Sequence, residues 1–334
     1  MSNHKNETNL QAPRFMLTII STPAKTEAMT RYALDRGATC AYASYASGTV
    51  PNAILSFLGL ADVRREIAML PVTESLGRTL MDELATEFDI EKRMSGVVYL
   101  QSIDAGDAAV EAAPYTLIAA IVNEGDGERV VESARECHPV GATILRATGS
   151  ADHSAKTFAF EIVPLKEIAI IVTRTVWADE LVDHIYQSMR SDEPGRGVLF
   201  TSPVLAVAGI RTADDDPATA SCAPKTPPAP TEDDILHALF VIVDRGHTSD
   251  IVATAEAAGS TGATVFHCRR TDRESRAWHE RLADPEKEIV ILVAPKPTAD
   301  SIEEALVALA QAHDGHIDVG RWPVHTFELL SDRR

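Results

Sequence analysis

Residues that could bind a phosphate group gather in the middle third of the chain. The stretch GATILRATGS, residues 141–150, combines threonines, glycines and an arginine, and PGRG follows at 194–197. Backbone N–H groups of glycine-containing loops can surround a phosphate, and arginine supplies positive charge. The same residue types also suit a turn that leads into a β-strand. The chain has no Walker A motif, so both interpretations stay open on these residues alone.

The pattern around GATILRATGS occurs three times, which indicates internal repetition. The repeated markers are an apolar run, a GAT tripeptide and a run that begins with a charged residue, Glu and Ile. They begin at Phe15, Gly37 and Arg65, then at Tyr115, Gly141 and Lys166, then at His237, Gly262 and Lys287. The markers shift by 100, 104 and 101 residues, and then by 122, 121 and 121. These near-constant shifts predict three tandem units.

Each unit must contain the elements that position its polar residues, and their order follows from hydrophobic periodicity. An apolar strand, a helix, the GAT strand, the charged-Glu-Ile strand, a second helix and a last strand follow one another. This β-α-β-β-α-β order is the ferredoxin-like arrangement, an α+β fold. The helix before GAT ends at Gly37, which predicts a glycine helix cap. The shared GAT is therefore interpreted as the turn into a strand, with Thr39, Thr143 and Thr264 as equivalents.

The repeat boundaries divide the whole chain. The predicted parts are a disordered tail at 1–14, units at 15–103, 115–210 and 235–330, and a flexible linker at 211–234. Proline, alanine and acidic residues dominate that linker, so it cannot bury a core.

Composition and charge narrow the classes of function. The formal net charge of −18 disfavours binding to nucleic acid or to anionic membranes. The four cysteines show no metal-ligand spacing, and the first residues lack the apolar core of a signal peptide. Apolar runs fall far short of the roughly 20 residues that cross a bilayer. The sequence therefore predicts a cytoplasmic protein with reduced thiols and no membrane insertion.

The second copy resembles the P-II signalling-protein family. The resemblance is carried by GATILRATG, PLKEIAIIV and DEPGRGVLFTSPVLAVAGIR. In that family a glycine-containing strand leads into the T-loop, a Gly-x-Gly B-loop precedes the last strand, and a basic segment follows. The resemblance implies trimers with nucleotides bound in the clefts between subunits. Three fused copies then imply a single-chain pseudo-trimer that is monomeric as a chain.

The resemblance also implies a ligand site in the second copy. Its expected members are Thr143, Arg146, Thr148, Gly149, Lys166, Gly195, Arg196, Gly197 and Arg211. Val198 stands where the family has a phosphate-binding lysine, and the loop between Ala147 and Leu165 is short for a T-loop and lacks its tyrosine. In the third copy, Gly320 and Arg321 are expected to correspond to Gly195 and Arg196.

The expected function is that of a regulator and not of an enzyme, because none of the common catalytic motifs is present. The implied ligand is an adenine nucleotide such as ATP, ADP or AMP, with no obligatory cofactor and no metal. The implied partner is a transporter or a metabolic enzyme, regulated through ordering of the loop after Thr148. Two alternatives stay open: an interaction scaffold that has lost its ligand, and a metal-binding protein similar to CutA. The HDGH stretch with His313 and His316 is interpreted as a surface turn.

Overall fold

The computed structural model describes residues 14–49, 62–92, 95–103, 113–150, 164–190, 196–210, 236–273, 286–312 and 317–330. One order of elements, β-α-β-β-α-β, occurs three times along these residues. The first segment contains β1 (Arg14–Ser21), α1 (Pro23–Asp35), β2 (Cys40–Thr49), β3 (Asp62–Thr73), α3 (Glu74–Glu87) and β4 (Val97–Ile103). The second contains β5 (Tyr115–Asn123), α4 (Gly127–Cys137), β6 (Ala142–Gly149), β7 (Leu165–Arg174), α5 (Thr175–Met189), β8 (Gly197–Val204) and the short β9 (Ala206–Ala208). The third contains β10 (Leu236–Asp244), α6 (Thr248–Ala257), β11 (Thr264–Asp272), β12 (Glu286–Pro295), α7 (Lys296–Ala312), β13 (Asp318–Val324) and the short β14 (Phe327–Leu329).

Each segment forms a four-stranded antiparallel sheet with the same strand order. The orders are β4-β1-β3-β2, β8-β5-β7-β6 and β13-β10-β12-β11. The strand register is also shared, since the pairs Ser21 with Glu66, Val122 with Glu167 and Val243 with Glu288 lie at the same place in each sheet. Corresponding residues are therefore 101 positions apart between the first and second segments, and 121 between the second and third.

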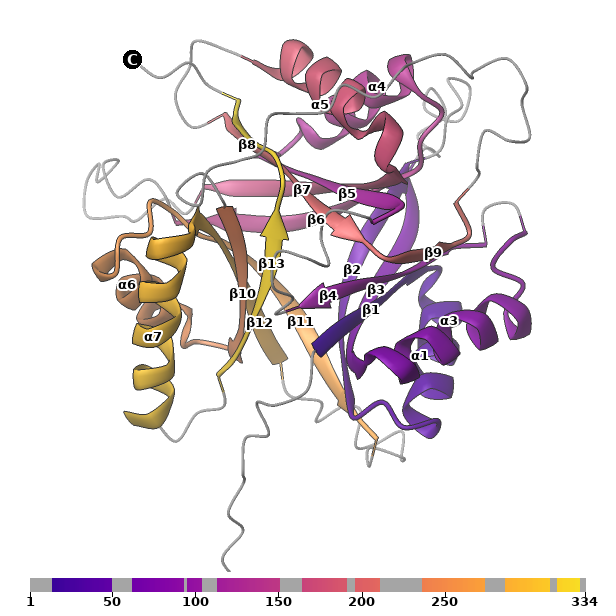
Figure 1. The fold of residues 1–334 in the computed structure, drawn as a ribbon, viewed down its shortest axis with the longest axis horizontal. Helices are drawn as coiled ribbons and strands as arrows, with labels where there is room; N and C mark the ends of the chain where they lie inside the picture. The colour runs from indigo at the N-terminus through magenta and orange to yellow at the C-terminus, as the bar shows by residue number, and fades with distance from the viewer. Residues whose placement is uncertain are drawn as a thin grey trace, which may run out of the picture.

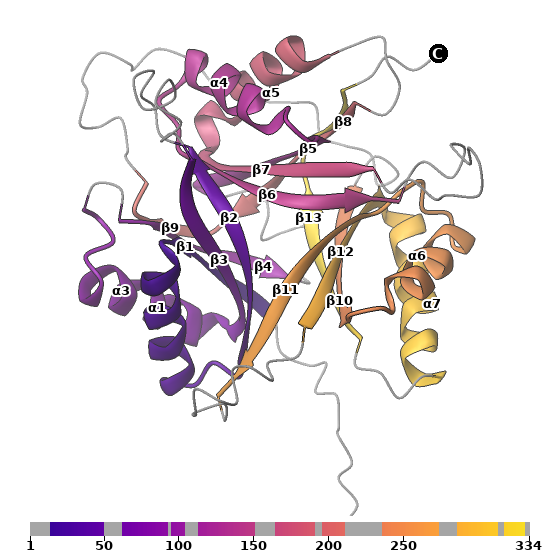
Figure 2. The same cartoon turned by 180° about the vertical axis from the view of Figure 1, so that it is seen from behind.

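The three sheets join at one strand from each, β2, β6 and β11 (Figures 1 and 2). The start of β6 pairs with the end of β2, through Thr143 and Gly48. The start of β11 pairs with the end of β6, through Thr264 and Gly149. The start of β2 pairs with the end of β11, as at Cys40 and Asp272. These three seams close a ring. The short strands add further crossings, because β9 pairs with β4 and β14 pairs with β8.

The apolar core has one central and three outer parts. The central cluster takes side chains from all four main strands of each segment. Each outer cluster lies between one sheet and its two helices, which Figure 1 shows on the outside of the molecule. Both faces of every sheet are therefore buried, which explains why strands such as LHALFVIVD are almost continuously apolar. In β10, Phe240 and Ile242 enter the central cluster, while Leu239 and Val241 face the helices.

The shared register corrects the expected equivalence of the three GAT tripeptides. Thr143 and Thr264 hold the same place in β6 and β11, opposite Ile170 and Ile291. In the first segment that place, opposite Met69, belongs to Tyr42, and Thr39 lies before β2. The GAT at Gly37 is thus displaced by three residues. The glycine cap predicted there is present, with a φ of +120°.

The proposed match of Gly320 and Arg321 to the B-loop is wrong. Both residues lie inside β13, where Gly320 pairs with Phe240. A Cβ atom at Gly320 would lie 2.1 Å from the Phe240 ring, so this glycine makes room for an aromatic side chain. Arg321 instead forms ion pairs with Asp300 and Glu303 of α7.

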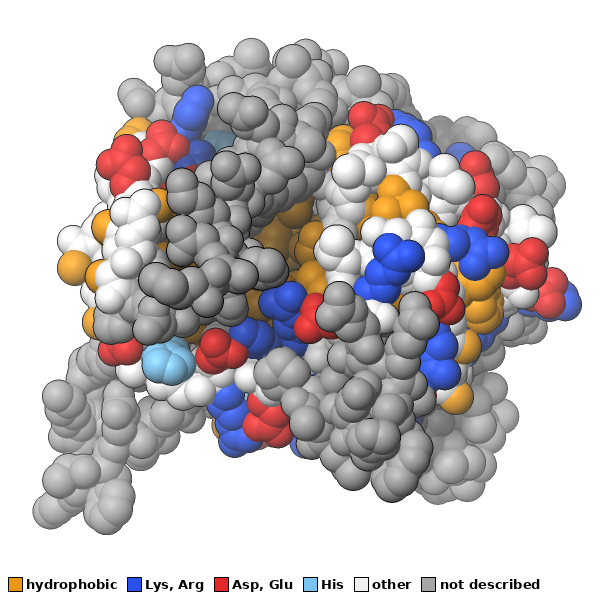
Figure 3. Space-filling model, turned by 90° about the horizontal axis from the view of Figure 1, so that it is seen from below, with side chains coloured by type: hydrophobic (Ala, Val, Ile, Leu, Met, Phe, Trp, Pro, Cys, Tyr) orange, Lys and Arg blue, Asp and Glu red, His pale blue; other side chains and the backbone are white. Residues whose placement is uncertain are grey.

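The remaining predictions concern membrane-spanning helices, the cysteines and segments predicted to lack structure. No helix among the described residues is long and apolar enough to cross a membrane. The cysteines that the structure describes, Cys40, Cys137 and Cys268, are free thiols. The HDGH histidines, the predicted linker and residues 1–13 of the tail predicted at 1–14 lie outside the described residues, and Arg14 begins β1. Seen from below, the molecule has a hollow in which hydrophobic side chains are exposed, with basic and acidic side chains beside it (Figure 3).

Candidate functional site

Lys166 and Arg196 each contact the turn between β5 and α4. The Lys166 Nζ atom donates a hydrogen bond to Asn123 Oδ1 at 2.7 Å. The Arg196 guanidinium lies 3.4 Å from Asp126 Oδ2, on the other side of the same turn. Lys166 is the second residue of β7, Arg196 directly precedes β8, and both strands flank β5. The sheet order therefore places two cations that are 30 positions apart on either side of the end of β5.

The first amide of α4 is already capped by a carboxylate. Glu167 Oε2 accepts a hydrogen bond from the Gly127 N–H at 2.8 Å. A carboxylate is stabilised at this place, because helix N-termini expose unsatisfied N–H groups and carry partial positive charge. A second anion can use this amide only if Glu167 moves. Next to this turn lie the side chains of Lys166 and Arg196 and the end of the strand beside β7.

That strand end belongs to β6, where Thr148 and Gly149 meet the third segment. The Thr148 hydroxyl donates to the Val265 carbonyl at 3.4 Å. Ser150 follows with a backbone N–H that donates to Ala263 O at 2.9 Å, and its Oγ accepts from Ala263 N at 2.8 Å. Gly149 packs against Lys166, since a Cβ there would lie 3.3 Å from Lys166 Cε. Thr148, Gly149 and Lys166 thus form one group at the seam between β6 and β11.

Thr143 does not join this group. It is buried at the opposite end of β6 and pairs with Gly48 of the first segment. Six residues of strand, at about 3.3 Å each, put Thr143 roughly 20 Å from Gly149. Arg146 lies between them with an exposed side chain, opposite Glu167 in the register.

Gly197 has a clear structural role. Its φ is +144°, and a Cβ there would lie 2.1 Å from the Ile121 carbonyl oxygen. Gly96 holds the same place in the first segment, with a φ of +141° and the Ile20 oxygen 2.5 Å from its would-be Cβ. Gly195 and Arg211 lie outside the described residues, so their predicted roles stay untested.

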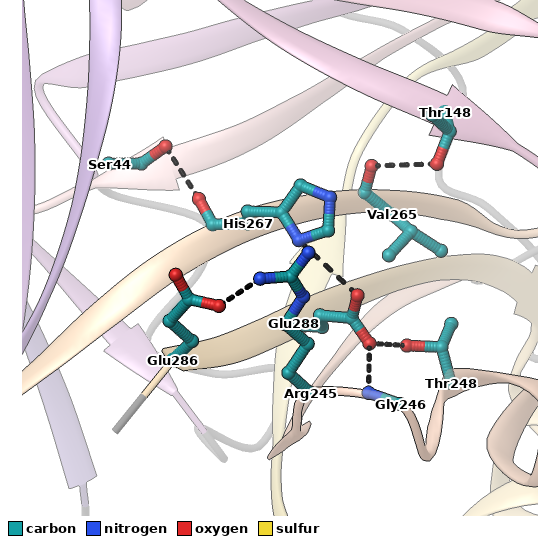
Figure 4. Close-up of polar contacts among 9 residues, drawn as sticks. All are labelled: Ser44, Thr148, Arg245, Gly246, Thr248, Val265, His267, Glu286 and Glu288. Atoms are coloured by element: carbon teal, nitrogen blue, oxygen red, sulfur yellow. Dashed lines mark hydrogen bonds and ion pairs between the residues drawn. The ribbon is translucent and has the colours of Figure 1, made fainter. Parts of the chain in front are cut away.

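The residue that sequence reasoning passed over is the Glu of each charged-Glu-Ile run. Glu66, Glu167 and Glu288 occupy one register position, and each is held differently. In the third segment Glu288 accepts hydrogen bonds from Gly246 N, at 3.1 Å, and from the Thr248 hydroxyl. It also lies 3.3 Å from His267 Nδ1 (Figure 4). Recurrence of Glu in all three runs was the available signal.

In the first segment the equivalent carboxylate is paired across a seam. Arg269 of β11 binds buried Glu66 with its NH2 atom at 2.5 Å, and its NH1 atom donates to Tyr45 Oη at 3.0 Å. Burial raises the pKa of Glu66, and Arg269 opposes that rise. Because Arg269 and Glu66 are 203 positions apart, no local pattern in the sequence indicates this contact. The same seam between β2 and β11 contains Ser44, whose hydroxyl donates to the His267 carbonyl at 2.8 Å (Figure 4).

The second segment is similar to a known family of regulators. Residues 115–214 match the family described as nitrogen regulatory protein P-II. This range covers β5 to β9 and includes the group at Lys166 and Arg196. The chain therefore contains a P-II-like domain, whose family consists of signal-transduction proteins.

Two solved structures align with larger parts of the chain, at TM-scores too low to show a shared fold. An aspartate kinase from Synechocystis aligns with 92% of this chain at 11% identity and a TM-score of 0.21, and the chain spans 43% of that protein. An anthrone oxidase-like protein aligns with 65% of this chain and 94% of its own length, at 9% identity and a TM-score of 0.18. No curated protein matches the chain.

Proposed function

We propose that this chain is a P-II-like signal-transduction protein in which three ferredoxin-like units pack as a single-chain pseudo-trimer. The family match over residues 115–214 is the observation that carries the proposal. Two features of the fold support its extension to the whole chain. The three segments share one element order and register, and the β2, β6 and β11 seams close a ring around a common core.

The assembly state gives a first test. A ring closed within one chain needs no further copies, so we expect a single species of 36.1 kDa by light scattering in solution. A stable assembly of three times that mass would contradict the pseudo-trimer. That result would not decide whether the P-II-like domain binds a ligand, which the titration below tests.

The proposed ligand is an adenine nucleotide or a similar small anion, bound beside Lys166, Arg196 and Gly149. Two cations near one strand end favour a phosphate, since charge-assisted hydrogen bonds are the strong ones. The site lies where the second segment meets β11 of the third, so it is shared between two units.

Regulation is proposed to act through the β6–β7 connection. That connection leaves β6 at Gly149 and returns at Leu165, and a ligand at its base would alter its contacts with a protein partner, such as a transporter or a metabolic enzyme. The protein acts as a regulator without catalysis of its own.

Isothermal titration with ATP, ADP, AMP and cyclic dinucleotides tests the ligand. Lys166→Gln and Arg196→Gln should each weaken binding about 10-fold or more, because a hydrogen bond to a charged group contributes about 1.5–3 kcal/mol. Lys287→Gln is the matched control, since Lys287 holds the same register position in the third segment and pairs with Asp244.

Two results would overturn the ligand proposal. One is the absence of heat with every nucleotide, together with a thermal stability that none of them changes, which would favour an interaction scaffold. The other is equal weakening by Lys166→Gln and Lys287→Gln, which would place the ligand elsewhere or show a general loss of charge.

A further inference from the structure

Three metal-ligating side chains converge on the outer face of the second segment, away from the ligand site. Cys137 ends α4, His138 follows it, and Glu180 lies on α5. Their ligand atoms, Sγ, a ring nitrogen and a carboxylate oxygen, all lie within 4.8 Å of one another. His138 Nε2 and Glu180 Oε2 are 3.1 Å apart. Cys137 and His138 are half-buried, while Glu180 is exposed to solvent.

The first and third segments show which residues the fold has at the positions that correspond to these three donors. With the shared offsets, the residues that correspond to His138 are Gly37 and Gly259, which cap their helices with φ values of +120° and +102°. Cys137 corresponds to Arg36 and Ala258, and Glu180 corresponds to Thr79 and Ser301. The fold therefore requires none of the three donors, yet the second segment has all of them.

Contacts of these capping residues confirm the correspondence. Gly37 faces Leu76, and Gly259 faces Thr298, each at the start of the segment's second helix. The equivalent residue in the second segment is Trp177, on which the His138 ring stacks at a centroid distance of 4.8 Å and an angle of 14°. His138 has an extended backbone, with φ −141° and ψ 150°, in place of the glycine cap. The indole thus holds the imidazole in a fixed plane beside Glu180.

We propose that Cys137, His138 and Glu180 form a binding site for a divalent transition-metal ion of the Zn²⁺ class. Sulfur, nitrogen and oxygen donors of these kinds are the ligands that Zn²⁺ uses, and three protein ligands leave the fourth position to water. Bond lengths of about 2.0–2.3 Å put tetrahedral donors about 3.3–3.6 Å apart. The His138–Glu180 separation is already close to this value. The Cys137 thiol lies within 4.8 Å of the other two donors and would close the remaining gap by a side-chain rotation. The thiolate is the metal ligand, so binding releases the Cys137 proton.

The test is a titration with Co²⁺ and then Zn²⁺ in the presence of a phosphine reductant. We expect one Co²⁺ per chain with a thiolate-to-metal absorption band, and its loss when Zn²⁺ is added. Cys137→Ser should abolish the band and weaken Zn²⁺ binding, measured against a chromophoric chelator, about 100-fold or more. His138→Gln and Glu180→Gln should each weaken binding about 10-fold or more.

The matched controls are His184→Gln and Glu136→Gln. These two side chains also link α4 and α5, with Nε2 and Oε2 3.3 Å apart, and they should leave metal affinity unchanged. Unfolding by urea verifies that each variant is folded. Absence of a thiolate band in the wild-type protein would overturn the site. Equal losses in His138→Gln and His184→Gln would also overturn it, since they would indicate non-specific surface binding.

Discussion

Gly197→Ala is expected to destabilise the protein by about 3 kcal/mol or more. At a φ of +144° an L-residue is strained by about 1–3 kcal/mol. In addition, the new Cβ would lie 2.1 Å from the Ile121 carbonyl oxygen, so β8 must shift against β5, at a cost of a further 1–3 kcal/mol or so. Urea unfolding would show this loss as a lower midpoint with an unchanged slope.

Gly141→Ala is the control for this prediction. Gly141 lies four residues beyond α4, has no positive φ, and has nothing within 4 Å of its would-be Cβ. Its replacement should change stability by no more than about 0.5 kcal/mol. The P-II resemblance assigned Gly197 to a ligand-binding loop. If Gly197→Ala keeps full stability and loses only nucleotide affinity, the ligand role is right and the structural role is wrong.

Tyr42→Ala is expected to cost about 3–5 kcal/mol and to affect all three segments together. Tyr42 is 1% exposed and belongs to the central cluster, to which every sheet contributes. Its hydroxyl lies 3.1 Å from Asp318 Oδ2 of the third segment. Burial raises the pKa of this phenol, so the hydroxyl stays protonated and donates to the carboxylate. Loss of the ring therefore opens a cavity where the segments meet.

Two companion variants separate the contributions. Tyr42→Phe keeps the ring and should cost only about 1 kcal/mol for the hydrogen bond. Tyr45→Ala removes a tyrosine further along the same strand, where Tyr45 is 66% exposed, and should cost well under half as much as Tyr42→Ala. Circular dichroism and the fluorescence of the three tryptophans, Trp177, Trp278 and Trp322, should report one shared transition. Two separate transitions would contradict a common core.

The sequence identified only some of the residues at the candidate ligand site. Lys166 and Arg196 were indicated by the P-II resemblance, and the sheet order places both beside the end of β5. Thr143 lies apart from Gly149 and Lys166 because a strand of eight residues reaches from one seam to another, and no local pattern in the sequence shows which seam each end meets. Glu167 was missed because the sequence alone does not distinguish a carboxylate that caps a helix from an ordinary surface charge.

Periodicity and spacing by themselves determined the order of strands and helices and the threefold repetition, while the P-II resemblance indicated the two cations. These properties are local, since periodicity records which faces of each element are buried. Only the tertiary structure decided how the sheets join and that Gly37 lies out of register with Gly141. The same holds for the close approach of two strands at Gly197. It also holds for the contact of Cys137 and His138 with Glu180. Each of these depends on contacts between residues far apart in the chain. Such contacts are fixed by packing of the whole molecule and leave no pattern in any single stretch.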